Sequence, residues 1–155
     1  MQVSVDFGML YTMKTNTNNI LTIYTDGGSR GNPGPAATGV VVKRGELLLY
    51  EHGEYLGNTT NNSAEYHALL SALSWVARSS FEDVSRVDCF LDSLLVVEQL
   101  RGRYKLKSLD LKPLYTSIKS LELSLSFPVV YHHVPREQNQ HADRLVNEAL
   151  DAHTR

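Results

Sequence analysis

The chain has little of several things, and each shortage excludes a class of protein. Its one cysteine, Cys89, excludes a disulfide scaffold and a cysteine-rich zinc site. No apolar run approaches the ~18 residues that a membrane-spanning helix needs. Residues 1–19 lack the basic stretch followed by an apolar stretch of a secretory signal, so we expect a cytoplasmic protein. The net charge of −2 cannot hold a nucleic acid by bulk attraction, so a polyanion would need a local basic patch or bound metal ions.

What the chain does contain is an ordinary globular composition. Its 155 residues correspond to about one domain and are enough to bury a substantial core. Hydrophobic residues make up 42% and charged residues 21%, which argues against a disordered tail protein or a fibre. The polar run Thr15–Asn19 sets the first residues apart. We therefore expect residues 1–19 to be an N-terminal extension, frayed and outside the core, and residues 20–152 to form the domain.

The hydrophobic pattern from Ile20 onward predicts an α/β domain. Apolar, β-branched segments bounded by turn residues predict strands at 20–25, 37–42, 46–55, 85–91 and 129–134. Helical spacing predicts helices at 63–78, 94–100, 110–123 and 139–152. Short links join the first three strands, as in antiparallel hairpins, whereas helices separate the later ones, as in parallel crossovers. The expected fold is a five-stranded mixed sheet, three antiparallel strands and then parallel ones, with helices on both faces.

Four acidic residues occupy positions that favour a common site. Asp26 and Asp92 end the first and fourth strands, and such ends open into the crevice where α/β sheets bind ligands. Glu65 and Asp143 lie on the apolar faces of their helices, where an unpaired carboxylate is costly. Converging acids repel each other unless a divalent cation binds between them, and hard oxygen ligands suit Mg²⁺ or Mn²⁺.

Each acid also has a simpler explanation, which the spacing alone leaves open. Asn62 and Glu65 match a capping box that would only close the start of a helix. Asp92 could be an ordinary helix N-cap, and Asp26-Gly27-Gly28 could be an ordinary turn.

The order and spacing of four segments resemble the type 1 ribonuclease H family. The segments are TDGGSRGNPGPAATG (25–39), TTNNSAEYHAL (59–69), LDSLLVVEQL (91–100) and HADRL (141–145). The match extends over nearly the whole chain, from about Ile20 to Ala152, and it implies the ribonuclease H-like fold.

By this resemblance the four acids are the catalytic and metal-binding residues of an endonuclease: Asp26, Glu65, Asp92 and Asp143. The family hydrolyses the RNA strand of RNA–DNA hybrids and leaves 5′-phosphate and 3′-hydroxyl ends. The implied cofactors are two Mg²⁺ ions about 4 Å apart, for which Mn²⁺ can substitute, and Asp26 would bridge them.

The resemblance also implies residues that contact the hybrid. The 2′-hydroxyl that marks RNA is displayed in the wide minor groove. Matching family positions that contact the two strands are Gly27, Gly28, Asn32, Thr60, Asn61 and Asn62, with Thr60 a candidate for a DNA phosphate. For Asn32, a structural role in the loop before Pro33 is an equally open alternative.

A cluster of basic residues follows the helix at 94–100. It contains Arg101, Arg103, Lys105, Lys107, Lys112 and Lys119, with Asp110 as the single nearby acid. Many family members carry a longer basic helix here that binds the hybrid, and this chain has a shortened one. We expect Arg101, Arg103 and Lys105 to contact phosphates, while a merely solvated loop is the alternative.

The chain departs from the family pattern before Asp143. The segment lacks the histidine that many members place on a flexible loop, and it resembles a branch with a shorter loop. Arg136 is expected to stabilise charge near the leaving phosphate, and Glu137 to reach a metal ion. Leu94 stands where the family often has a glutamine, so one groove contact is expected to be lost.

Two other functions remain open at this stage. One is a non-catalytic module that binds hybrids or duplexes, although such a module gains nothing from an anionic pocket. The other is a different nuclease of this fold, but exonucleases usually pair Asp-x-Glu on the first strand, where this chain has Gly28. The expected partner is an RNA–DNA hybrid, with double-stranded RNA an open second substrate, no membrane, and a monomeric chain.

Overall fold

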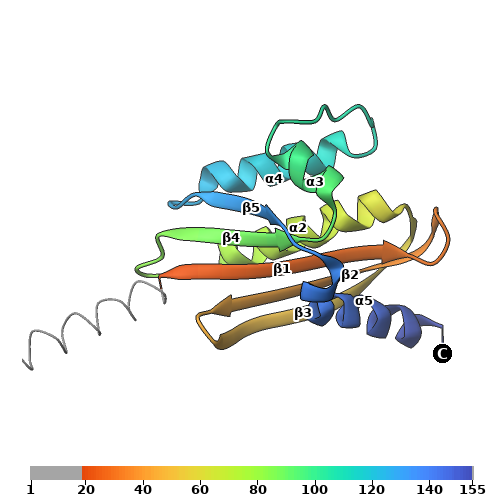
Figure 1. Cartoon of the computed structure of the whole chain (residues 1–155), viewed down its shortest axis with the longest axis horizontal. Helices are drawn as coiled ribbons and strands as arrows, with labels where there is room; N and C mark the ends of the chain where they lie inside the picture. Colours follow the sequence, from red (N-terminus) through yellow and green to blue (C-terminus); the bar gives the residue numbers. More distant parts are fainter. Residues whose placement is uncertain (1–18, 155) are drawn as a thin grey trace, which may run out of the picture.

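The computed structural model describes residues 19–154, which form a single mixed sheet with helices packed on it (Figure 1). The expected extension therefore lies outside the described residues, apart from Asn19. The elements in chain order are β1 (Ile20–Ser29), β2 (Gly34–Arg44), β3 (Leu47–Thr59), α2 (Asn61–Arg78), β4 (Arg86–Leu91), α3 (Leu94–Leu100), α4 (Lys112–Ser124), β5 (Val129–His133), the 3₁₀ turn η1 (Arg136–Gln138) and α5 (Gln140–His153).

The strand order is β3-β2-β1-β4-β5. Strand β2 pairs antiparallel with β1 and with β3, whereas β4 pairs parallel with β1 and β5. The predicted mixed sheet is thus confirmed. Because β1 and β4 are parallel neighbours, their C-terminal ends lie at the same edge of the sheet, as the sequence predicted for Asp26 and Asp92.

Helices cover both faces of the sheet. The main core lies between the sheet and α2, α3 and α4, and it includes the fully buried side chains of Leu21, Ile23, Leu69 and Leu73. A smaller apolar layer lies under α5, where Val41 packs with the helix residues Ala142 and Leu145. Among the described residues, no helix is long and apolar enough to cross a bilayer.

Two predicted boundaries were wrong near the strand ends. Asp26–Gly28 does not form a turn, because these residues continue β1 in register with 37–39 of β2. The polar stretch 57–62 is not a loop either. Strand β3 runs to Thr59 across a register shift, and α2 begins at Asn61 rather than at Ser63. Both extensions come from cross-strand pairing, which local turn signals do not report.

Gly27 permits the contact that brings α2 to the end of β1. A Cβ atom at this position would lie 2.2 Å from the backbone carbon of Ala64 and 2.4 Å from the backbone nitrogen of Glu65. The helix backbone therefore rests directly on the strand. On the opposite face, Gly39 lets the backbone of α5 approach β2 just as closely, because a Cβ atom at this position would lie 2.1 Å from the carbonyl oxygen of Ala142. Glycines thus set the two distances that place Glu65 and Asp143 near the sheet.

We expect Gly27→Ala to destabilise the fold strongly, because the clash is with helix backbone rather than with a flexible side chain. Overpacking of this kind costs about 1–3 kcal/mol or more. The free energy of unfolding from urea denaturation measures the effect. Gly28→Ala is the matched control, since its Cβ would meet only a Val146 methyl at 3.8 Å. Equal stability of the two variants would contradict this packing.

Candidate active site

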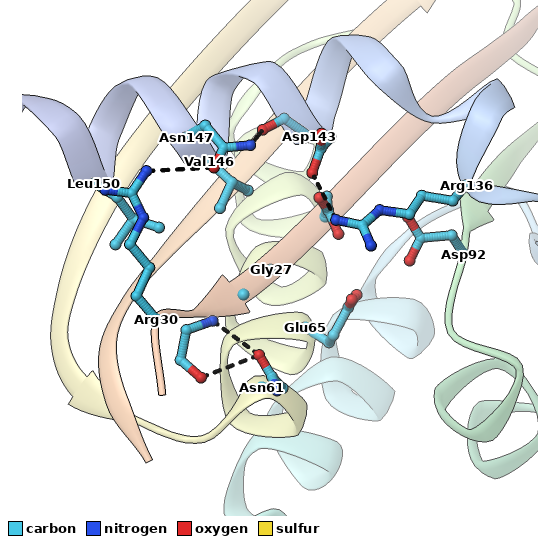
Figure 2. Close-up of a pocket in the computed structure, with 13 residues that line it drawn as sticks. Gly27, Arg30, Asn61, Glu65, Asp92, Arg136, Asp143, Val146, Asn147 and Leu150 are labelled. Atoms are coloured by element: carbon cyan, nitrogen blue, oxygen red, sulfur yellow. Dashed lines mark hydrogen bonds and ion pairs between the residues drawn. The ribbon is translucent and has the colours of Figure 1, made fainter. Parts of the chain in front are cut away.

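All four predicted acids line one pocket at the C-terminal ends of β1 and β4. The pocket has a volume of about 450 Å³. Asp26 comes from β1 and Asp92 follows β4, while Glu65 comes from α2 and Asp143 from the first turn of α5. Figure 2 shows these elements converging on the pocket from both faces of the sheet.

Three of the carboxylates are close enough to share an ion. Single oxygen atoms of Asp26, Glu65 and Asp92 all lie within 4.8 Å of one another. Asp26 and Glu65 are buried, at 8% and 7% exposure. Asp143 is more open, with its side chain 33% exposed, and it closes the same pocket from α5.

The simpler explanations for these acids do not hold in the structure. Helix α2 is capped by Thr60, whose hydroxyl accepts from the backbone nitrogen of Ser63, so Glu65 is not part of a capping box. Helix α3 is capped by Ser93 rather than by Asp92. Since residues 26–28 continue β1, the turn explanation for Asp26 is also wrong.

The acids perturb one another electrostatically. Burial, followed by the charges of Asp92 and Asp143, raises the pKa of Asp26 to about 8. Burial, followed by the charges of Asp26 and Asp92, raises the pKa of Glu65 well above its ordinary range. Without a bound cation, Asp26 and Glu65 therefore stay protonated to a higher pH than ordinary carboxylic acids do.

The pocket fits a divalent cation. Glu65 Oε2 is buried and has no hydrogen-bond partner among residues 19–154, which is costly for an ionised oxygen. The converging donors are all carboxylate oxygens, the ligands that hard cations such as Mg²⁺ prefer. A cation among them would satisfy the orphaned oxygen and remove the mutual repulsion.

Asn139 is a site residue that sequence reasoning missed. Its side chain is 1% exposed, and its Nδ2 donates to the carbonyl oxygen of Thr25 at 2.8 Å and to Asp92 Oδ2 at 3.2 Å. Its main-chain carbonyl accepts from the backbone nitrogen of Asp143 in the first turn of α5. The side-chain amide thus connects the ends of β1 and β4 at the start of α5. The available signal was an asparagine one turn before Asp143, at the start of an otherwise amphipathic helix.

The predicted substrate contacts fall into two groups. Gly27, Gly28 and Asn61 line the pocket. Asn61 Oδ1 accepts from the backbone nitrogen and hydroxyl of Ser29, at 2.9 and 3.0 Å. Asn32 has a structural role in its loop, because its Oδ1 accepts from the backbone nitrogen of Asn61 at the start of α2. The remaining two positions, Thr60 and Asn62, lie beside the pocket and do not line it.

The segment before α5 contributes one of its two predicted residues to the pocket. Arg136 lines it, and its guanidinium lies 3.7 Å from Asp143 Oδ1 (Figure 2). Its side chain is 79% exposed and therefore free to reorient. Glu137 lies on the same 3₁₀ turn but is not among the residues that line the pocket.

The basic residues that follow α3 form more ion pairs and hydrogen bonds within the protein than the sequence indicated. The prediction that Asp110 is its single acid was wrong, because Glu98 lies 3.0 Å from Arg101 and 3.6 Å from Arg103. The Arg101 guanidinium also donates to the carbonyl oxygen of Tyr131 in the edge strand β5. Arg101 is thus used within the fold, whereas Lys105 is exposed and makes no ion pair among the described residues.

Comparisons with known proteins agree with this geometry. A family model described as Reverse transcriptase-like matches residues 24–149. Ribonuclease HI of Halobacterium salinarum is 43% identical over 130 residues, which are 83% of this chain and 63% of that protein. A bifunctional protein of Mycobacterium tuberculosis is 41% identical over 134 residues, 85% of this chain but 36% of that protein. The chain thus spans between about one third and two thirds of these relatives.

Solved structures match over a larger share of their length. LC11-RNase H1, isolated from compost, superposes with a TM-score of 0.82 at 43% identity, covering 88% of this chain and 99% of that one. The same enzyme in complex with an RNA/DNA hybrid superposes with a TM-score of 0.80 at 41% identity, covering 87% and 99%.

Proposed function

The chain belongs to the type 1 ribonuclease H family, and on that premise we propose that residues 20–152 form an endonuclease domain that hydrolyses the RNA strand of RNA–DNA hybrids. The products would carry 5′-phosphate and 3′-hydroxyl ends. The observation that carries the proposal is the cluster of Asp26, Glu65 and Asp92 within 4.8 Å at the sheet edge. A binding module would be weakened by such an anionic pocket, so the cluster favours catalysis over binding alone.

The four acids would hold the metal ions. Asp26 would contribute most, because Asp92 and Asp143 act on its pKa and its own charge acts on the pKa of Glu65. A pair of Mg²⁺ ions, when bound, supplies an activated water and compensates charge on the leaving 3′-oxygen. The protein's own part is to fix the carboxylates. Asn139 holds Asp92 through its Nδ2, and Gly27 lets Glu65 approach Asp26.

Recognition of the RNA strand would take place beside the acids. A Cβ at Gly28 would contact only a Val146 methyl, at 3.8 Å, and its absence lets a ribose approach the backbone closely. Asn61 is exposed at the rim, and because its Oδ1 already accepts two hydrogen bonds from Ser29, its Nδ2 would donate to a 2′-hydroxyl. The exposed Thr60 at the helix start would meet a phosphate of the DNA strand.

Arg136 would stabilise charge near the leaving phosphate, in the segment where many family members carry a loop histidine. Its exposed guanidinium already reaches toward Asp143 and can turn toward a phosphate beside the acids. A guanidinium stays charged at every working pH, so its contribution would be electrostatic stabilisation rather than proton transfer.

The basic segment would contact the polymer through Arg103, Lys105 and Lys107. We expect Lys105→Ala combined with Lys107→Ala to weaken hybrid binding about tenfold and to lower the slope of log affinity against log salt by about 2. Fluorescence anisotropy at several salt concentrations measures both. Arg101→Ala should instead lower the free energy of unfolding by about 1–3 kcal/mol, because Oε1 of the buried Glu98 and the Tyr131 carbonyl both lose the donor that Arg101 supplies. An unchanged salt slope in the lysine variant would remove the segment from the footprint.

A panel of substrates tests the proposed function. The purified chain is incubated in Mg²⁺ with a labelled hybrid, a duplex RNA and a duplex DNA of one sequence. Cleavage of the hybrid's RNA strand, with 5′-phosphate ends and an intact DNA strand, is the expected result. Binding of the hybrid without any cleavage would replace the enzyme by a binding module, and cleavage of duplex DNA would point to another nuclease of this fold.

A further inference from the structure

The pocket extends well beyond the acids. From the carboxylates it continues along the groove between the end of β1 and the second half of α5, where Gly28, Val146 and Leu150 form its floor. Figure 2 shows Arg30 at the far end of this extension, with its side chain directed toward α5. The metal ions would bind at the acid cluster, so this distant part of the pocket must have a different role.

Arg30 is held there by a weak and exchangeable contact. Its Nη2 lies 2.7 Å from Asp151 Oδ1 and 3.4 Å from Asn147 Oδ1. The side chains of Arg30 and Asp151 are 44% and 54% exposed, and exposed ion pairs contribute little to stability. No hydrogen bond of Nε or Nη1 is found among the described residues. The guanidinium therefore has donors available for an anion.

The position of Arg30 matches a strand that passes over the acids. On α5, Asp143, Asn147 and Asp151 follow each other at intervals of one helical turn, about 6 Å each. Arg30 thus lies about 12 Å along the groove from the acid that closes the catalytic end. A polymer threaded through the groove would present its next phosphates to Arg30 and the apolar side of a ribose to Val146 and Leu150.

We propose that Arg30 forms a subsite for a backbone phosphate of the RNA strand one or two linkages from the one that is cut, and that Asp151 occupies the guanidinium until the phosphate displaces it. The inference rests on the proposed function for the identity of the strand. Arginine suits this task because its planar fork of donors matches the oxygens of a phosphate. The phosphate needs a cation here, because the catalytic end of the groove is strongly acidic.

Two opposite substitutions test the exchange. Binding of a fluorescent hybrid is measured in full-length chains that carry Asp26→Asn, so that the substrate stays intact. Arg30→Ala should weaken binding about 5- to 10-fold and lower the salt slope by about 1. Asp151→Asn should tighten binding about 2- to 5-fold, because Arg30 no longer has a competing partner. In the double variant, Arg30→Ala with Asp151→Asn, that gain should vanish.

Another ion pair on α5 supplies the controls. Arg144 and Glu148 lie 3.5 Å apart and lie outside the pocket lining. Arg144→Ala and Glu148→Gln change the net charge as the test variants do, and both should leave the salt slope and the affinity nearly unchanged. The proposal is overturned if Arg30→Ala behaves like Arg144→Ala, or if the gain from Asp151→Asn persists without Arg30.

A neutral phosphate locates the contact in the substrate. Methylphosphonates are placed at one RNA position at a time, and binding is measured with and without Arg30→Ala. One neutral linkage near the cleavage site should weaken binding only when Arg30 is present. If no linkage does so, the subsite does not exist. Failure of the wild-type chain to cleave the hybrid would instead overturn the proposed function, while this comparison would still report on Arg30.

Discussion

Asp26→Asn is expected to lower the rate of hybrid cleavage by at least about a thousandfold while the fold is kept. The substitution removes the carboxylate that is affected by both Asp92 and Asp143. Losing one such group removes charge stabilisation that is worth several kcal/mol in the transition state. A single-turnover assay with RNA labelled at its 5′ end measures the loss, and circular dichroism verifies the fold.

The matched control is Asp88→Asn. Asp88 is also a buried aspartate of the sheet, but its carboxylate contacts Arg86 and His132 and lies outside the pocket. Per folded molecule, Asp88→Asn should cleave at close to the normal rate. Comparable rates for Asp26→Asn and the unaltered chain would show that the carboxylate cluster is not the catalytic centre.

The second large effect is a loss of stability with rising pH when no divalent cation is present. The folded-state pKa of Asp26 is about 8, whereas in the unfolded chain it is close to 3.8. Between these values the unfolded chain binds fewer protons at this group than the folded chain does. The contribution of this group to the free energy of unfolding is therefore fully present below about pH 4 and is lost as the pH rises toward 8. At about 1.4 kcal/mol per tenfold change in proton affinity, the effect of this group is about 6 kcal/mol.

Urea unfolding at pH 5, 6, 7 and 8 in the presence of a chelator measures this dependence. Glu65, whose pKa is also raised by burial and by its acidic neighbours, acts in the same direction. Asp26→Asn should flatten the profile, and millimolar Mg²⁺ should restore stability at pH 8, because a bound cation stabilises the ionised carboxylates. Stability that rises from pH 5 to pH 8 without metal would contradict the electrostatic description of the pocket.

Local patterns favoured a common site for the acids but did not decide it. Asp26 and Asp92 end apolar strands and Glu65 interrupts an apolar helical stripe, yet capping and turn roles stayed open, and the full set of four acids came from the resemblance to the family. The mixed sheet itself followed from link lengths. Strand ends, helical faces and link lengths depend on residues close in the chain, so the hydrophobic pattern was enough to predict them.

What the sequence did not predict depends on contacts between distant segments. Gly27 and Gly39 are required by the helix backbones that rest on them, and nothing near them in the chain reports those helices. Asn139 acts on Thr25 and Asp92, which are 114 and 47 residues away. The internal role of Arg101 was missed because its acceptor, the Tyr131 carbonyl, belongs to a strand that follows another helix.

The dependence of cleavage on the four carboxylates and their ions can be followed with a hybrid labelled on both strands, in Mg²⁺, after chelation, and after Mg²⁺ is returned. We expect that only the RNA strand is cut, that cutting stops when the ions are removed, and that it resumes when they are restored. An RNA strand digested at the same rate in excess chelator would show that the four carboxylates serve some other purpose.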